Sequence, residues 1–163
     1  MTSVAEVRRV LAGVTDPEIP VITIEDLGVL RDVEVHGDAV VVTVTPTYSG
    51  CPAMDEIRAD ITTALHAHGW DDVTVRTVLS PAWTTEWMSD RGRQRLHEFG
   101  IAPPSVRRGV PVPLALGRWA PVVACPQCGS ADTEELTRFA STSCKSLWRC
   151  LACREPFDHF KDH

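Results

Sequence analysis

The sequence contains no long apolar run and no leader-like segment. No stretch approaches the roughly 20 apolar residues that a membrane-spanning helix requires, so we expect no membrane span. The opening residues, MTSVAEVRRVLAGV, include an acid and two arginines where a secretory signal has an unbroken apolar stretch. We therefore expect a cytoplasmic protein whose cysteines take part in metal or thiol chemistry rather than in disulfides.

Two sets of catalytic motifs are also missing. The sequence has no pair of Glu-x-x-His motifs, which would indicate a di-iron centre held by carboxylates and histidines. It has no glycine-rich fingerprint for binding a dinucleotide. We therefore expect no catalytic activity from this chain alone.

Positive charge is scarce in the first part of the chain. The formal net charge is −6, but residues 1–100 hold 16 acidic and 8 basic side chains, whereas residues 101–163 hold 6 and 8. Nucleic-acid-binding domains usually present a basic surface. The acidic first part and the lack of a dense lysine pattern therefore argue against DNA or RNA as the main partner.

Cysteine and proline divide the chain into two modules. Five of the six cysteines fall within the last 39 residues, and five of the twelve prolines fall within residues 101–121. Such a proline density prevents continuous helix or sheet pairing. We expect a domain at residues 1–100, a connector rich in proline and arginine at residues 101–121, and a small module at residues 122–163.

The hydrophobic pattern of the first module predicts helices and strands in the order α-β-β-α-β-α. Apolar residues recur at helical spacing near the start, a valine-rich hairpin turns at Gly37, and an amphipathic helix is followed by a third strand and a last helix. The expected segments are residues 4–11, 30–45, 54–69, 72–79 and 84–99. The predicted fold class is α+β, with a small α/β sandwich before the C-terminal module.

This pattern also predicts how the long helix packs. Ile57, Ile61 and Leu65 share one face of that helix, which we expect to lie across a three-stranded sheet. The loop of residues 47–50 is expected at the edge of the sheet.

Cys51 is the candidate for chemistry in the first module. Pro52 suits the first helical position, so Cys51 is expected at the N-cap, where backbone amides and the helix dipole stabilise a thiolate. The alternative is a buried structural cysteine. Asp16 and Glu18 flank a proline. One interpretation is that they cap a helix or form a turn, and the alternative is that they bind a metal or a partner.

Three runs of the first module resemble a known family. The runs DPEI at residues 16–19 and IEDLGV at residues 24–29, followed by TYSGCP at residues 47–52, are similar to SufT-type iron–sulfur assembly factors. The resemblance covers about residues 5–80. It implies that Asp16, Glu18, Thr47 and Cys51 handle iron or a cluster transiently.

The second module carries a four-cysteine pattern. The motifs CPQC at residues 125–128 and CLAC at residues 150–153 lie 21 residues apart, which suits four thiolates around one ion in a zinc ribbon. Iron in a rubredoxin-like site uses the same ligands, and a redox-active C-x-x-C motif is a further alternative. The predicted metal ligands are Cys125, Cys128, Cys150 and Cys153. A tetrahedral site with four thiolates has no open position, so this metal is expected to be structural.

Three other residues of the second module are weaker candidates. Lys145 lies beside Cys144 and could lower its pKa, which would make Cys144 a reactive thiol. The alternative is a thiol packed against the ribbon. His159 and His163 are either additional ligands or solvent-exposed residues.

The whole layout resembles the PaaD family, the D subunits of bacterial phenylacetyl-CoA epoxidase systems. The features that carry this resemblance are the assembly-like domain, the connector, the two C-x-x-C motifs, FASTSCK at residues 139–145 and EPFDHFK at residues 155–161. The resemblance implies an accessory subunit in aerobic phenylacetate degradation whose partners are an oxygenase and its reductase. One hypothesis is help with iron or iron–sulfur maturation of these partners, and the alternative is a stable architectural or regulatory subunit. A nucleic-acid-binding ribbon is the third and weakest interpretation.

Overall fold

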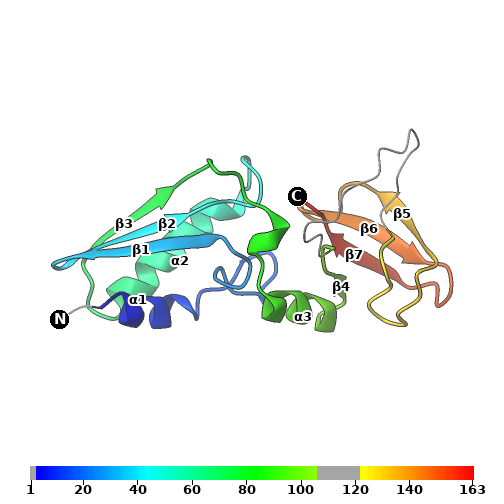
Figure 1. Cartoon of the computed structure of the whole chain (residues 1–163), viewed down its shortest axis with the longest axis horizontal. Coiled ribbons are helices and arrows are strands. Elements are labelled where there is room, and N and C mark those ends of the chain that lie inside the picture. Colours follow the sequence, from blue (N-terminus) through cyan, green and yellow to red (C-terminus); the bar gives the residue numbers. More distant parts are fainter. Residues whose placement is uncertain (1–2, 106–121) are drawn as a thin grey trace. The chain divides into compact units, whose positions relative to one another are not determined.

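The computed structural model describes residues 3–105 and 122–163, which form two compact units, Met1–Arg95 and Leu96–His163. Figure 1 shows the elements of both units. Among the described residues, none of the helices combines the length and apolar character needed to cross a membrane. The α+β class predicted from the sequence is confirmed, since each unit contains a sheet and the first also contains helices.

The first unit is built on a three-stranded sheet in the order β1-β2-β3 (Figure 1). Strands β1 (Leu30–His36) and β2 (Ala39–Val44) form the expected antiparallel hairpin, whose turn contains Gly37 with a positive φ of 64°. Strand β3 (Asp72–Thr77) pairs parallel to β2 after the crossover through α2 (Ala53–His66). Because the crossover places β3 on the free side of β2, β2 is the central strand. The loop of residues 47–50 therefore follows the middle of the sheet, and its predicted position at the edge is wrong.

Helices α1 (Val4–Leu11) and α2 cover one face of this sheet. Ser3 and Glu6 form a capping box at the start of α1, with Glu6 N donating to Ser3 Oγ at 3.2 Å. Alternate residues of β2 face these helices and are fully buried at Val40, Val42 and Val44. The apolar face of α2 is buried as predicted, and the residues that form it are Ala53, Met54, Ile57, Ile61 and Leu65.

An irregular segment between α1 and β1 supplies much of the remaining core. Ile19, Ile22, Ile24 and Leu27 are almost completely buried although they belong to no helix or strand. Asp16 stabilises the first turn of this segment, because its Oδ1 accepts hydrogen bonds from the backbone N–H groups of residues 18 and 19 at 2.8 and 2.9 Å. Side-chain hydrogen bonds thus replace regular secondary structure here.

The last predicted helix of the first module, residues 84–99, is divided in the structure. A short 3₁₀ helix, η1 (Thr85–Trp87), precedes α3 (Asp90–Glu98), and Met88 and Ser89 separate them. Ser89 Oγ accepts a hydrogen bond from Gly92 N at 2.9 Å, which places Ser89 as the cap of α3. The single helix predicted from composition is therefore wrong between residues 84 and 89.

Asp26 holds this divided segment in place. Its carboxylate accepts hydrogen bonds from Ser89 Oγ at 2.7 Å and from Arg91 Nε at 2.9 Å, and its own side chain is only 4% exposed. Burial on its own raises the pKa of Asp26, but the hydrogen bonds from Arg91 and Ser89 outweigh it and leave the pKa below its ordinary value. Gly28, at φ 80°, lets the backbone of Trp87 pass so closely that a Cβ would lie 2.6 Å from its carbonyl oxygen.

The second unit is a four-stranded sheet in the order β4-β7-β6-β5 (Figure 1). Its strands are β4 (Ile101–Ala102), β5 (Thr133–Thr137), β6 (Lys145–Cys150) and β7 (Pro156–Phe160). Pairs β5–β6 and β6–β7 are antiparallel, and β4 lies parallel to β7. The small core combines cysteines with apolar side chains, and its members are Ala102, Val123, Cys125, Trp148, Cys150 and Phe157.

The start of the expected connector takes part in this sheet. Residues 101–102 form β4, although the proline density of residues 101–121 predicts no continuous sheet pairing. Only two residues pair, directly before Pro103 and Pro104, which is consistent with the effect of proline on a strand. Residues 106–121 of the expected connector lie outside the described residues.

We predict that Leu65→Ala lowers the free energy of unfolding by about 2–5 kcal/mol, because it leaves a cavity under a completely buried side chain. Urea denaturation followed by circular dichroism measures this loss. Thr63→Ala is the matched control, since Thr63 is an exposed residue of the same helix. A loss below about 1 kcal/mol for Leu65→Ala would show that this face of α2 is not core.

We predict that Asp26→Asn destabilises the protein by about 1–3 kcal/mol at neutral pH. Because the folded-state pKa of Asp26 lies below its unfolded value, the ionised carboxylate stabilises the fold above that unfolded value. Its contribution is lost as the pH falls through the folded-state pKa. Urea denaturation at a series of pH values should therefore show wild type and variant converging in acid.

Asp55→Asn is the control for this experiment, since the Asp55 side chain is 89% exposed. A deficit of Asp26→Asn that stays constant from neutral to acidic pH would contradict a role for the charge.

Candidate functional site

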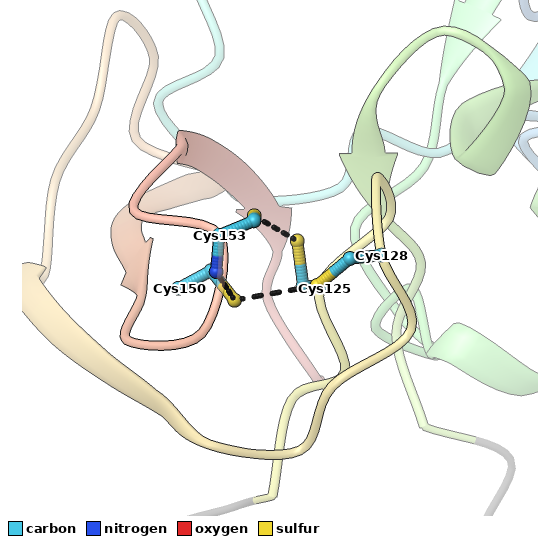
Figure 2. Close-up of side chains that lie close together, drawn as sticks. All are labelled: Cys125, Cys128, Cys150 and Cys153. Carbon is cyan, nitrogen blue, oxygen red and sulfur yellow. Dashed lines mark hydrogen bonds between the residues drawn. The ribbon is translucent and has the colours of Figure 1, made fainter.

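Two facing segments carry the four cysteines predicted as metal ligands. Cys125 and Cys128 lie on the loop before β5, whereas Cys150 is the last residue of β6 and Cys153 lies in the loop that follows it. Figure 2 shows the sulfur atoms of the two loops pointing toward one another. In both loops the residue after the second cysteine has a positive φ, 75° at Gly129 and 67° at Arg154. This left-handed conformation lets the backbone turn back sharply directly after each C-x-x-C motif.

The distances between these sulfurs fit one tetrahedral metal ion. Cys125 Sγ lies 3.8 Å from Cys153 Sγ, and Cys128 Sγ lies 3.5 Å from Cys150 Sγ. All four ligand atoms lie within 4.8 Å of one another. A zinc ion with Zn–S bonds of about 2.3 Å requires sulfur–sulfur separations of about 3.8 Å. The two loops are thus arranged as a metal-bound ribbon requires.

The site favours the thiolate form, which binds metal, at Cys150, whereas the neighbouring cysteines raise the pKa of Cys153 to about 12. The backbone N–H of Cys153 donates to Cys150 Sγ at 3.4 Å, and this hydrogen bond is the largest cause that lowers the pKa of Cys150 to about 7. Cys125 and Cys150 are buried, whereas Cys128 and Cys153 are exposed. The site therefore has two sulfurs anchored in the core and two facing the surface.

Cys51 lies next to the helix start but not at the predicted N-cap. Helix α2 begins at Ala53, and its N-cap is Pro52, which lies in the helical region at φ −68° and ψ −23°. The N-cap assignment of Cys51 is therefore wrong by one residue, because Pro52 already has the helical conformation. The carbonyl of Cys51 still accepts a hydrogen bond from Met54 N at 3.3 Å. Cys51 is half-buried and forms no disulfide.

The other residues implied by the SufT-type resemblance occupy two different segments. Thr47 is half-buried in the same loop as Cys51, between β2 and α2. Asp16 is buried and Glu18 exposed in the irregular segment after α1. Within residues 3–105 and 122–163, the four ribbon cysteines are the one set of three or more Cys, His, Asp or Glu side chains whose ligand atoms converge. The candidates of the first unit do not form a preassembled metal site of that kind.

Cys144 is a buried thiol at the start of β6. Its neighbour Lys145 is itself buried and forms an ion pair with Asp158 at 2.9 Å. Lys161 is a cation that interacts with Cys144. Partial burial lowers the pKa of Lys161, and the interaction with Cys144 offsets part of that shift. Thr142 Oγ1 lies 3.1 Å from Cys144 Sγ. Sequence proximity alone could not identify Lys161, because β-sheet pairing brings it to this site.

His159 and His163 do not join the four cysteines. His159 is buried rather than solvent-exposed, with Nδ1 3.5 Å from Ser146 Oγ and its ring edge-on to Trp148. Burial lowers the pKa of His159 and favours the neutral ring. It therefore belongs to the core side of the ribbon sheet.

We predict that serine at any one of the four ribbon positions abolishes tight metal binding and unfolds the second unit. Its core is too small to fold without the metal contribution. Metal analysis should find one tightly bound ion per wild-type chain and none in these variants. Cys144→Ser is the matched control and should keep the metal; loss of metal in that variant would make the ligand assignment wrong.

Two family matches divide the chain as the structure does. Residues 4–77 match the family described as "Iron-sulfur cluster assembly protein". Residues 110–161 match the family described as "PaaD zinc beta ribbon domain".

Solved structures resemble the first unit. A domain of unknown function DUF59 from Bacillus anthracis is 29% identical with a TM-score of 0.53, and the match covers 57% of this chain and 90% of that one. A conserved hypothetical protein from Thermotoga maritima is 28% identical with a TM-score of 0.50, and the match covers 58% and 94%.

Two proteins of known sequence extend the comparison. An Fe-S protein maturation auxiliary factor from Porphyromonas gingivalis is 36% identical over 93 residues, which are 56% of this chain and 88% of that protein. A protein from Escherichia coli, named as the D subunit of a 1,2-phenylacetyl-CoA epoxidase, is 45% identical over 158 residues. That match covers 97% of this chain and 92% of the other, so this chain belongs to the family of phenylacetyl-CoA epoxidase D subunits.

Proposed function

We propose that this chain is a non-catalytic accessory subunit of a phenylacetyl-CoA epoxidase system and assists iron or iron–sulfur maturation of the oxygenase or its reductase. The observation that carries the proposal is the combination in one chain of an iron–sulfur assembly domain and a ribbon of the PaaD type. The assembly domain supplies the metal-handling surface, and the ribbon supplies a module particular to the epoxidase family. The relative from P. gingivalis, named for Fe–S protein maturation, supports the first of these roles.

The ribbon holds a resident metal in this proposal, and that metal is zinc. Four thiolates complete a tetrahedral shell and leave no position for a substrate. Zinc suits this set because it is redox-inactive and has no geometric preference beyond the tetrahedron that the sulfurs already form. The role of the metal is to fold the second unit, so a partner that recognises this unit depends on the metal indirectly.

Cys51 is the transient ligand of the first unit. It is half-buried, lies at the start of α2 and forms no disulfide, so its sulfur is placed for temporary coordination near the positive end of a 14-residue helix. One thiolate does not retain iron, and the remaining ligands come from the client protein. A weakly held metal is what a transfer factor requires, because it must be released.

Asp16 and Glu18 contribute differently to this proposal. Asp16 already accepts two backbone hydrogen bonds, so its main role is to form the turn that carries the exposed Glu18. Glu18 provides negative charge for iron or for a basic client surface. Thr47 is half-buried in the loop that carries Cys51.

We predict that Cys51→Ser leaves the fold and the ribbon metal intact but lowers the iron content and activity of the epoxidase in cells. Serine has nearly the same shape as cysteine and is a poorer ligand for iron. The experiment replaces the chain in cells that express the complete system, then purifies the oxygenase and the reductase separately. Iron analysis of each component also identifies the client.

Cys144→Ser is the matched control, since Cys144 is a second cysteine outside the four ribbon ligands. Glu18→Gln removes charge and keeps an oxygen acceptor, so it should reduce client iron, whereas Asp16→Asn should have little effect if Asp16 only forms a turn. Full epoxidase activity and client iron with Cys51→Ser would overturn metal transfer. The chain would then be a stable architectural or regulatory subunit, recovered in stoichiometric complex with the oxygenase.

A further inference from the structure

Strand β3 forms an open edge of the first sheet. Among the described residues its strand partner is β2, and Figure 1 shows it at the outer side of the sheet. Asp72, Thr74 and Arg76 are exposed, while Val73 and Val75 are only half-buried under α2. Edge strands present unpaired backbone groups to other chains, so this edge is available for pairing.

The hydrogen bonds of the parallel pair show which backbone groups face outward. Val78, which continues β3, donates its N–H to the carbonyl of Val44 on β2 at 2.9 Å. Backbone groups of successive strand residues point alternately to the two sides of the strand. Asp72, Thr74 and Arg76 therefore direct their N–H and C=O groups toward β2, whereas Val73 and Val75 direct theirs to the open edge.

We propose that β3 pairs antiparallel with β3 of a second copy of this chain, so that two sheets join into one of six strands. A two-fold axis through Thr74 places Val73 of each copy opposite Val75 of the other. These two residues have the outward backbone groups, so each pair exchanges two N–H···O=C hydrogen bonds. Their side chains lie on the helix-covered side of the sheet, since they are in register with Val40 and Val42.

The charges of β3 select this register. With the axis at Thr74, Asp72 of each copy lies opposite Arg76 of the other, and both are exposed on the open face of the sheet. These are non-hydrogen-bonded pairs, in which the side chains approach most closely. A shift by two residues would remove both charge pairs. The spacing of one acid and one base around Thr74 is therefore self-complementary under two-fold symmetry.

Apolar burial adds to the pairing. Val73 and Val75 are half-buried in one copy, and the cross-strand partner covers their remaining exposed area. The proposed interface uses only β3 of each copy. The Cys51 loop and the ribbon take no part in it. The assembly thus contains two copies of each candidate site and does not depend on the function proposed above.

Charge reversal combined with sedimentation equilibrium tests this pairing. We predict that wild type dimerises as its concentration rises, and that Asp72→Arg or Arg76→Asp alone weakens dimerisation roughly tenfold, because each creates two like-charge pairs. Mixing the two single variants should restore dimerisation, since like charges then no longer face each other across the two-fold axis in the mixed pair. The double variant should likewise dimerise as wild type does, because exchanging the acid and the base preserves both charge pairs.

Glu34→Arg is the matched control, because Glu34 lies on β1 at the opposite edge of the same sheet. Circular dichroism and ribbon metal content verify that each variant is folded. A wild type that remains monomeric at all concentrations would overturn the proposal. Dimerisation that neither single reversal weakens, or that the mixture fails to restore, would overturn it as well.

Discussion

The convergence of four cysteine side chains is the constraint on which we expect the fold of the second unit to depend. Among the described residues, its core cluster joins Cys125 and Cys150 to Ala102, Val123, Trp148 and Phe157, a small set that we expect to bury too little apolar surface to offset chain entropy by itself. Two of the cysteines belong to that cluster, so the metal site and the core form together. We therefore expect the ribbon strands, and the two residues of β4 that pair with β7, to depend on the same ion.

The first unit is stabilised by a different kind of interaction. A buried carboxylate, Asp26, fixes the segment around Ser89 and Arg91 to the irregular stretch before β1. Residues of the IEDLGV motif therefore have structural roles, since Asp26 anchors and Gly28 allows Trp87 to approach. The function proposed for this unit consequently rests on the Cys51 loop and the Asp16 turn, not on the whole of the resemblance.

Periodic segments of this chain could be predicted from the sequence, and irregular ones could not. The valine alternation of β1 and β2, the apolar face of α2 and the two C-x-x-C motifs each follow a local rule, and the structure contains all three. The stretch of residues 12–29 has no such period, because Asp16 and Thr23 side chains replace backbone ladders there. The break at Ser89 and the proximity of Lys161 to Cys144 depend on contacts between segments distant in sequence.

The metal proposed for the ribbon is resident, whereas the iron proposed for Cys51 is held transiently. The most direct measurement is metal analysis with absorption spectroscopy of anaerobically purified protein, before and after incubation with ferrous iron and sulfide in the presence of the apo-oxygenase or the apo-reductase. We predict one zinc per chain in wild type and Cys51→Ser alike, and transfer of iron or a cluster to one of the two recipients by wild type only. Equal transfer by both proteins, or iron in place of zinc in the ribbon, would contradict this prediction.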